Sequence, residues 1–127
     1  MTSVKELSEE ARRLDLLSTE GRFRLGEIAE ALGRALPTVT DLHDRLAADL
    51  ELNRDTITEA WFVASAFPPA TRRSDLPWTT YLILRFHPER HELVDRAASV
   101  GWNQARIQEE VSVRFAAHHL NPPDQPE

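Results

Sequence analysis

Two short runs of polar side chains, fifty positions apart, carry the hydrogen-bonding groups that proteins use to read nucleic acids. The first run contains Asn53, Arg54, Thr56 and Thr58, and the second contains Asn103, Gln104, Arg106 and Gln108. Arg pairs in bidentate fashion with guanine, Asn and Gln pair with adenine, and hydroxyls bond to phosphates or bases. At the start of a helix, these side chains would contact double-stranded DNA.

A helix-turn-helix would position the first run. That motif requires a small residue in its first helix, apolar residues on both inner faces and a tight corner, often Gly. With Ala47 as the small residue, all five apolar positions are filled, by Leu46, Leu50, Leu52, Ile57 and Ala60. Glu51 occupies the corner in place of Gly. We therefore expect a helix-turn-helix over residues 42–62.

The second run fits the same frame with Ala97 as the small residue. Gly101 then falls at the corner, while Arg96 and Glu110 occupy two positions that are usually apolar. This predicts a helix-turn-helix-like pair over residues 93–111. The apolar faces of this second pair match the motif less well than those of the first pair. Its polar side chains suit a DNA groove better, however, because Asp55 and Glu59 lie beside the first run and would repel phosphate.

A third frame overlaps the first and would make residues 37–46 the recognition helix, with Gly33 at the corner. Overlapping frames cannot all present a recognition helix. An ordinary helical bundle would also produce such matches, with the polar runs as solvated faces.

Arg72 and Arg73 lie in a Pro-rich segment between the two pairs. Adjacent guanidinium groups there would suit phosphate contacts or insertion into the minor groove. The alternative interpretation is a solvated loop.

Apolar periodicity predicts an all-α protein, a compact bundle of five to six helices. Helical patterns cover 3–17, where Ser3 and Glu6 are spaced as a capping box, and the rest of an N-terminal region, 1–67. In that region Gly21 interrupts, Gly33 ends a helix, Pro37 begins the next and Asn53 can cap a further one. Three prolines mark a connector at 68–77. A second helical region then spans 78–119, and a Pro-rich tail at 120–127 is expected to be disordered.

Composition narrows the classes of function. The net charge of −6 disfavours general nucleic-acid binding, although residues 61–106 hold six basic and four acidic side chains. No Cys is present, and no nucleotide-binding or acyl-transfer motif occurs. His87 and His91 lie four apart, but Pro88 separates them, so we expect no metal and no cofactor. The chain is expected to be a cytoplasmic non-enzyme without membrane contact.

The order of features from Arg24 to Val111 resembles small helix-turn-helix regulators of actinobacteria and their temperate phages, including phage immunity repressors. The likeness is carried by the segments RLGE, LAADLELNRDTI, VASAFPPATRR and VGWNQARIQEEV, and by Trp78. The resemblance implies sequence-specific DNA binding through the matching positions Arg54, Thr56, Thr58, Arg72 and Arg73. Glu51, Asp55 and Glu59 depart from the family's pattern.

Two hypotheses follow from these observations. The first is a sequence-specific DNA-binding transcriptional regulator, most simply a repressor, acting as a homodimer on a palindrome or as a monomer on an asymmetric site. The second is a helical adaptor or antirepressor that binds another protein through a face formed by Leu7, Leu14 and Leu17, without DNA contact.

Overall fold

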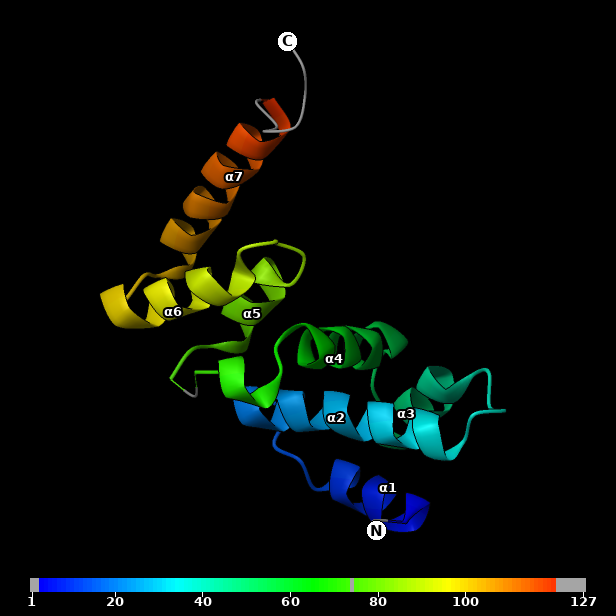
Figure 1. Ribbon diagram of the computed structural model, residues 1–127. Coiled ribbons are helices and arrows are strands. Elements are labelled where there is room, and N and C mark those ends of the chain that lie inside the picture. The colour runs from blue at the N-terminus through cyan, green and yellow to red at the C-terminus, as the bar shows by residue number, and fades with distance from the viewer. Residues whose placement is uncertain (1–2, 74, 121–127) are drawn as a thin grey trace.

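The computed structural model describes residues 3–73 and 75–120, with side chains as far as residue 114. These residues form helices and turns only, which confirms the all-α expectation. The elements are α1 (Val4–Arg12), α2 (Thr19–Ala35), α3 (Leu42–Leu50), α4 (Arg54–Ala66), the 3-10 helix η1 (Pro69–Thr71), α5 (Trp78–Leu84), α6 (Arg90–Val100) and α7 (Gln104–Leu120) (Figure 1).

The expectation of five to six helices was too low, because the described residues contain seven α-helices. The turn that includes Pro88 separates α5 from α6, which pack against each other. The α7 helix includes Leu120, which was expected in the tail, while the rest of that tail lies outside the described residues.

The first helix begins as its sequence predicts but ends early. The Ser3 hydroxyl accepts a hydrogen bond from the Glu6 amide, which is one of the two bonds of a capping box. The Glu6 carboxylate accepts from the Ser3 hydroxyl in place of the Ser3 backbone amide. The helix ends at Arg12 rather than at residue 17, because the chain turns there and Ser18 caps α2. The single helix expected over 3–17 is therefore wrong.

Glycine allows the next helix to start and pack where it does. Gly21 was expected to interrupt a helix, but it lies in the first turn of α2, where a Cβ would fall 1.9 Å from the Asp15 carbonyl oxygen. Gly26 lies against α4, and a Cβ there would fall 2.1 Å from the Ala60 carbonyl oxygen. A side chain at either position would force these segments apart.

The other end of α2 also differs from expectation. The helix continues past Gly33 to Ala35 instead of ending at the glycine. Pro37 lies in a turn, and α3 begins only at Leu42. A recognition helix over residues 37–46 is therefore excluded.

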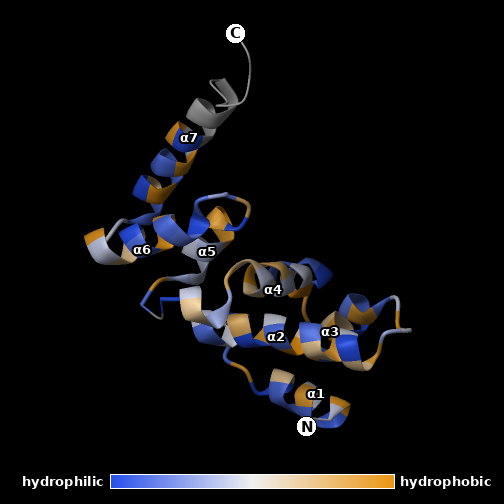
Figure 2. Cartoon of the chain, viewed as in Figure 1, coloured by the Kyte–Doolittle hydropathy of each residue, from blue (hydrophilic) through white to orange (hydrophobic). Residues whose placement is uncertain are grey.

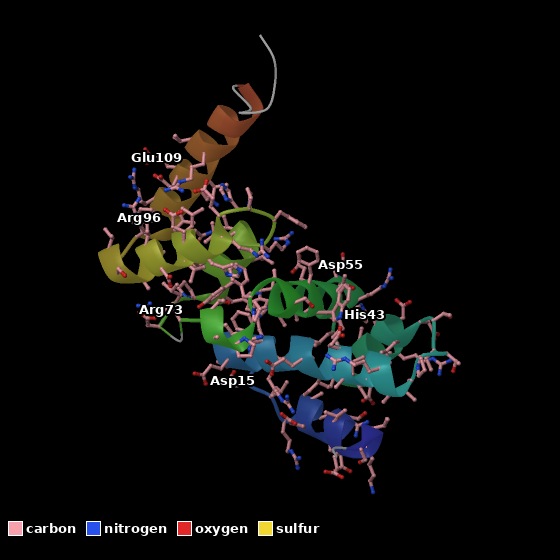
Figure 3. The ribbon with its side chains drawn as sticks, in the orientation of Figure 1. Asp15, His43, Asp55, Arg73, Arg96 and Glu109 are labelled. Atoms are coloured by element: carbon pink, nitrogen blue, oxygen red, sulfur yellow. The ribbon has the colours of Figure 1, made fainter. Side chains whose placement is uncertain are left out.

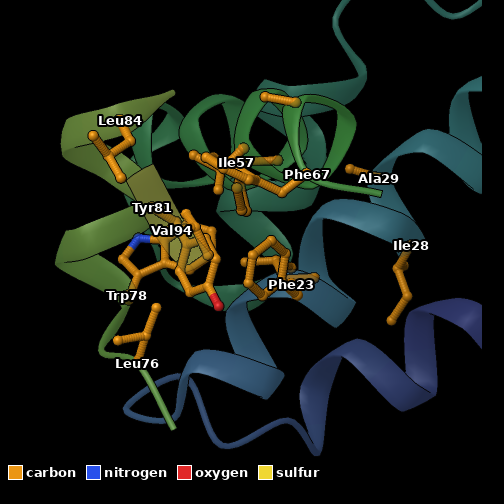
Figure 4. Close-up of a cluster of buried hydrophobic side chains, with 14 of the residues drawn as sticks. Phe23, Ile28, Ala29, Ile57, Phe67, Leu76, Trp78, Tyr81, Leu84 and Val94 are labelled. Atoms are coloured by element: carbon orange, nitrogen blue, oxygen red, sulfur yellow. The ribbon is translucent and has the colours of Figure 1, made fainter. Parts of the chain in front are cut away.

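Aromatic rings join the two halves of the chain. The Tyr81 ring of α5 contacts Phe23 of α2 and Phe67 at the end of α4, with centroids 4.9 and 5.1 Å apart (Figure 4). The Tyr81 hydroxyl also accepts from the Arg73 amide and donates to the Arg73 carbonyl. The described parts of the N-terminal region and of the second helical region therefore share one hydrophobic core, which extends from Leu7 to Ile107.

The C-terminal helices contribute to this core through Leu93, Val94 and Ala97 of α6 and Ile107 of α7. Both α6 and α7 contact α5, and the far end of α7 extends away from the other helices (Figure 1). Hydrophobic and hydrophilic residues are interspersed along its described part (Figure 2). Arg114 connects α7 to Glu89 and Glu92 at the start of α6. Among the described residues, no helix is long and apolar enough to cross a membrane.

Candidate nucleic-acid interface

The corner between α3 and α4 is closed by backbone hydrogen bonds. Glu51 adopts the left-handed conformation (φ 55°, ψ 43°), and the Leu52 amide donates to the Ala47 carbonyl at 2.8 Å. Asn53 then caps α4, because its side-chain oxygen accepts from the Asp55 amide at 3.0 Å. The cap predicted for Asn53 is confirmed, and it occupies the oxygen that a base contact would need.

The corner between α6 and α7 repeats this geometry fifty positions later. Gly101 is left-handed (φ 76°, ψ 40°), and the Trp102 amide donates to the Ala97 carbonyl at 3.1 Å. The Asn103 side-chain oxygen accepts from the Arg106 amide at 2.8 Å. The two segments therefore share a backbone corner and a capping residue as well as a sequence pattern.

Side chains of the first run are already engaged with α3. The Thr58 hydroxyl lies 2.9 Å from His43 Nδ1, so Thr58 bonds inward rather than facing outward as expected. Arg54 Nε lies 3.4 Å from Asp44 Oδ1, and Thr56 is half-buried. Burial and the neighbouring Arg54 lower the pKa of His43, which favours its neutral form.

Carboxylates dominate the exposed surface around this corner. Exposed Asp55 lies beside Arg54 at the start of α4 (Figure 3), and Glu51 is exposed at the corner itself. Asp49 is bound by Arg12 of α1 at 2.7 Å. Phosphates would meet repulsion here, since so few cations are left to neutralise them.

Arg72 packs within the protein, which corrects the expectation of a phosphate contact. Its side chain is only 16% exposed and donates from Nη1 to Glu27 Oε2 at 2.7 Å. Its Nε donates to the Phe67 carbonyl at 2.7 Å, and its guanidinium lies 4.1 Å from the centroid of the Phe23 ring.

Arg73 takes a different direction from its neighbour. Its side chain is 44% exposed and lies 3.5 Å from Asp95 of α6. The two adjacent arginines therefore do not present a paired cationic surface, because one turns toward α2 and the other toward α6.

The first turns of α7 expose the second polar run. Asn103, Gln104, Arg106 and Gln108 are all exposed, while Ile107 between them is buried at 2% exposure and anchors the helix. Arg106 is 47% exposed, although Glu109 and Glu110 lie within 3.4 Å of its guanidinium nitrogens. The structure thus brings the four residues of this run to one exposed end of α7.

Arg96 was not among the residues predicted from the sequence to contact DNA. Arg96 counted against the second motif because its position is usually apolar, yet its side chain is exposed on α6 (Figure 3). Exposure of a basic residue one turn before the corner could have been predicted from its polarity alone. It adds an exposed cation to α6, the helix that precedes α7 in the second corner.

The two histidines considered for metal binding have separate environments. His87 is buried in the turn before α6, where its Nδ1 accepts from the Glu89 amide at 3.0 Å. The His91 ring packs edge-on against Phe67. Within the described part of the chain, no group of three His, Asp or Glu side chains is arranged to hold a metal ion.

The chain matches no protein-family model, no curated protein and no solved structure. The functional argument therefore uses the geometry of the two corners and the chemistry of their exposed side chains.

Proposed function

We propose that the protein is a sequence-specific DNA-binding transcriptional regulator, most simply a repressor, in which α7 reads the bases. The observation that carries this proposal is the α6–α7 corner at Gly101, followed by the exposed side chains of Gln104, Arg106 and Gln108 at the start of α7. Asn103 caps this helix, as Asn53 caps α4. A recognition helix reads bases mainly through its N-terminal residues, and Asn, Gln and Arg are the side chains suited to that task.

The exposed side chains favour α7 over α4 as the reading helix. Arg106 of α7 and Arg54 of α4 are both paired with carboxylates, but Arg96 adds an exposed cation on α6, the helix that precedes α7. The N-terminus of a helix also attracts phosphate. Gln104 and Gln108 of α7 are exposed, whereas Thr56 and Thr58 of α4 are half-buried and Asp55 beside them is exposed. The net charge of −6 predicts weak nonspecific affinity, so discrimination between sequences would come from base contacts.

The helical face on which the adaptor hypothesis was based is not formed by the described residues. Leu7 is buried in the core, and Leu17 lies beyond the end of α1 and is 95% exposed. Because the chain turns between them, these residues do not form one helical face.

Selection from fragmented genomic DNA tests the proposal directly. Pure protein is incubated with fragments from its source genome across a series of salt concentrations, and bound fragments are sequenced. We expect enrichment of particular fragments over competitor DNA, with affinity falling as salt rises. An absence of fragment preference at low salt would contradict the proposal.

Two matched variants identify the reading helix. Arg106→Ala should weaken specific binding by roughly 1–3 kcal/mol, whereas Arg54→Ala should leave it unchanged. Circular dichroism of both variants controls for folding. The opposite order of effects would assign base reading to α4. Sedimentation of the complex then distinguishes a homodimer on a palindrome from a monomer on an asymmetric site.

A further inference from the structure

A cavity of about 470 Å³ lies in the half of the molecule that the proposed DNA contact does not use. Its walls come from the last turns of α2, the loop before α3, the first turn of α3 and one face of α4. This volume is in the range of small-molecule sites, which combine apolar walls with a few convergent polar groups.

An indole forms part of the wall. Trp61 of α4 donates its ring N–H to Glu30 of α2, which holds the indole in place. The His43 ring meets it edge-on, with centroids 5.6 Å apart; Figure 3 shows His43 at the junction of α3 and α4. An aromatic face held in this way can accept a flat apolar group or an organic cation.

Three carboxylates from three different elements line the same cavity: Glu30, Asp41 and Asp44. Hydrogen bonds from Trp61 and Arg34 lower the pKa of Glu30, so it is ionised at neutral pH.

The lining cations are Arg34 and Arg54, which are 77% and 63% exposed and each contact one of these carboxylates. Such exposed ion pairs contribute little energy and are readily exchanged. Asp41 is paired in the same way with Arg45 of α3, which is 68% exposed and lies 2.9 Å away. A positively charged guest would therefore bind by displacing exposed arginines from the three carboxylates.

The absence of a side chain at Gly33 keeps one wall open. A Cβ at this position would make only an ordinary contact, 3.8 Å from Leu42 Cδ2. A longer side chain there would project into the cavity without meeting the helix backbone. This glycine is therefore a position at which the cavity can be filled deliberately.

We propose that this cavity binds a small organic cation, with an ammonium or amidinium group among the carboxylates and an apolar body against Trp61. The site is independent of the proposed DNA contact, because none of its lining residues belongs to α6 or α7. A failure to bind the organic cation and a failure to bind DNA are therefore separate experimental outcomes.

Three probes of equal size and different charge test the site: benzamidine, benzamide and benzoate. Each is titrated into isotope-labelled protein while backbone amide and indole N–H signals are followed by NMR. We expect saturable shifts with benzamidine at roughly millimolar affinity. The shifts should map to Trp61, His43 and the end of α2, and benzoate should bind at least about tenfold more weakly.

A cavity-filling variant and its control complete the test. Gly33→Leu should abolish the benzamidine shifts, whereas Ala35→Leu adds a similar side chain at an exposed position of the same helix and should preserve them. The proposal is overturned by equal binding of benzoate, by shifts that map elsewhere, or by a folded Gly33→Leu protein that still binds. If Gly33→Leu does not fold, the shifts mapped on the unmodified protein still support or overturn the proposal.

Discussion

At the scale of single residues, Arg72 joins α2 to the end of α4 through hydrogen bonds to both. Replacement by Ala removes its bonds to Glu27 and to the Phe67 carbonyl, leaving Glu27 with only the longer contact from Arg24 and the carbonyl without this side-chain donor. We expect Arg72→Ala to lower the free energy of unfolding by about 2–3 kcal/mol. Urea denaturation followed by circular dichroism measures this loss.

Arg73→Ala is the matched control for that experiment. Its guanidinium makes one exposed contact, so the loss should stay below about 0.5 kcal/mol. Equal losses for the two variants would contradict the structural role assigned to Arg72.

His43 gives the protein a specific dependence on pH. Its folded-state pKa is lowered from the ordinary 6.5, so the unfolded chain binds its proton more readily than the folded protein does. Stability from neutral His43 is therefore present above pH 6.5 and is lost as the pH falls below it. Between pH 6.5 and 4.5, the ordinary values of His and Glu, the unfolding free energy of the native chain should fall more steeply than that of His43→Gln. Parallel slopes would show that His43 titrates normally.

At the scale of elements, the two left-handed corners predict substitutions of opposite sign. Glu51→Gly relieves a conformation that a side chain disfavours, and should raise the unfolding free energy by about 0.5–1 kcal/mol. Gly101→Ala should lower it by about 1 kcal/mol, because a Cβ there meets no atom within 4 Å and only the backbone conformation is penalised. Thermal unfolding of both variants provides the comparison, and changes of the same sign would argue against equivalent corners.

Local signals in the sequence predicted the presence of helices better than the residues at which the helices begin and end. Ser3 and Asn53 identified helix starts because a cap depends only on residues within the same turn. Gly21 and Gly33 misled, since both lie inside α2: Gly21 is required there because the Asp15 carbonyl leaves no room for a Cβ, whereas at Gly33 a Cβ would make only an ordinary contact. The late start of α3 after Pro37 depends on packing that no local pattern contains.

For the candidate site, the sequence predicted which residues are polar but could not predict the direction in which their side chains point. The polar type of Arg72 and Thr58 was apparent, but their inward partners Glu27 and His43 lie far away in the sequence. Exposure of the run at the start of α7 could be predicted, because Ile107 fixes which face is buried.

At the scale of the whole molecule, the shared core predicts one unfolding transition rather than two. Tyr81 contacts both Phe23 and Phe67 across the boundary that the sequence suggested between two regions. Circular dichroism in the far and near ultraviolet should therefore give coincident transitions. Tyr81→Phe removes the two bonds to Arg73 and should shift both curves together, by about 1–2 kcal/mol. Separate midpoints would show that the halves unfold independently.

The bonds that join the halves also bear on how the chain folds during synthesis. The Thr19 hydroxyl donates to the Leu76 carbonyl, 57 residues away, whereas each corner is closed by bonds that span only a few residues. Short-range bonds form early, and distant ones require the intervening chain to be made first. The first four helices therefore leave the ribosome with the Phe23 ring uncovered, and the arrival of α5 completes their enclosure.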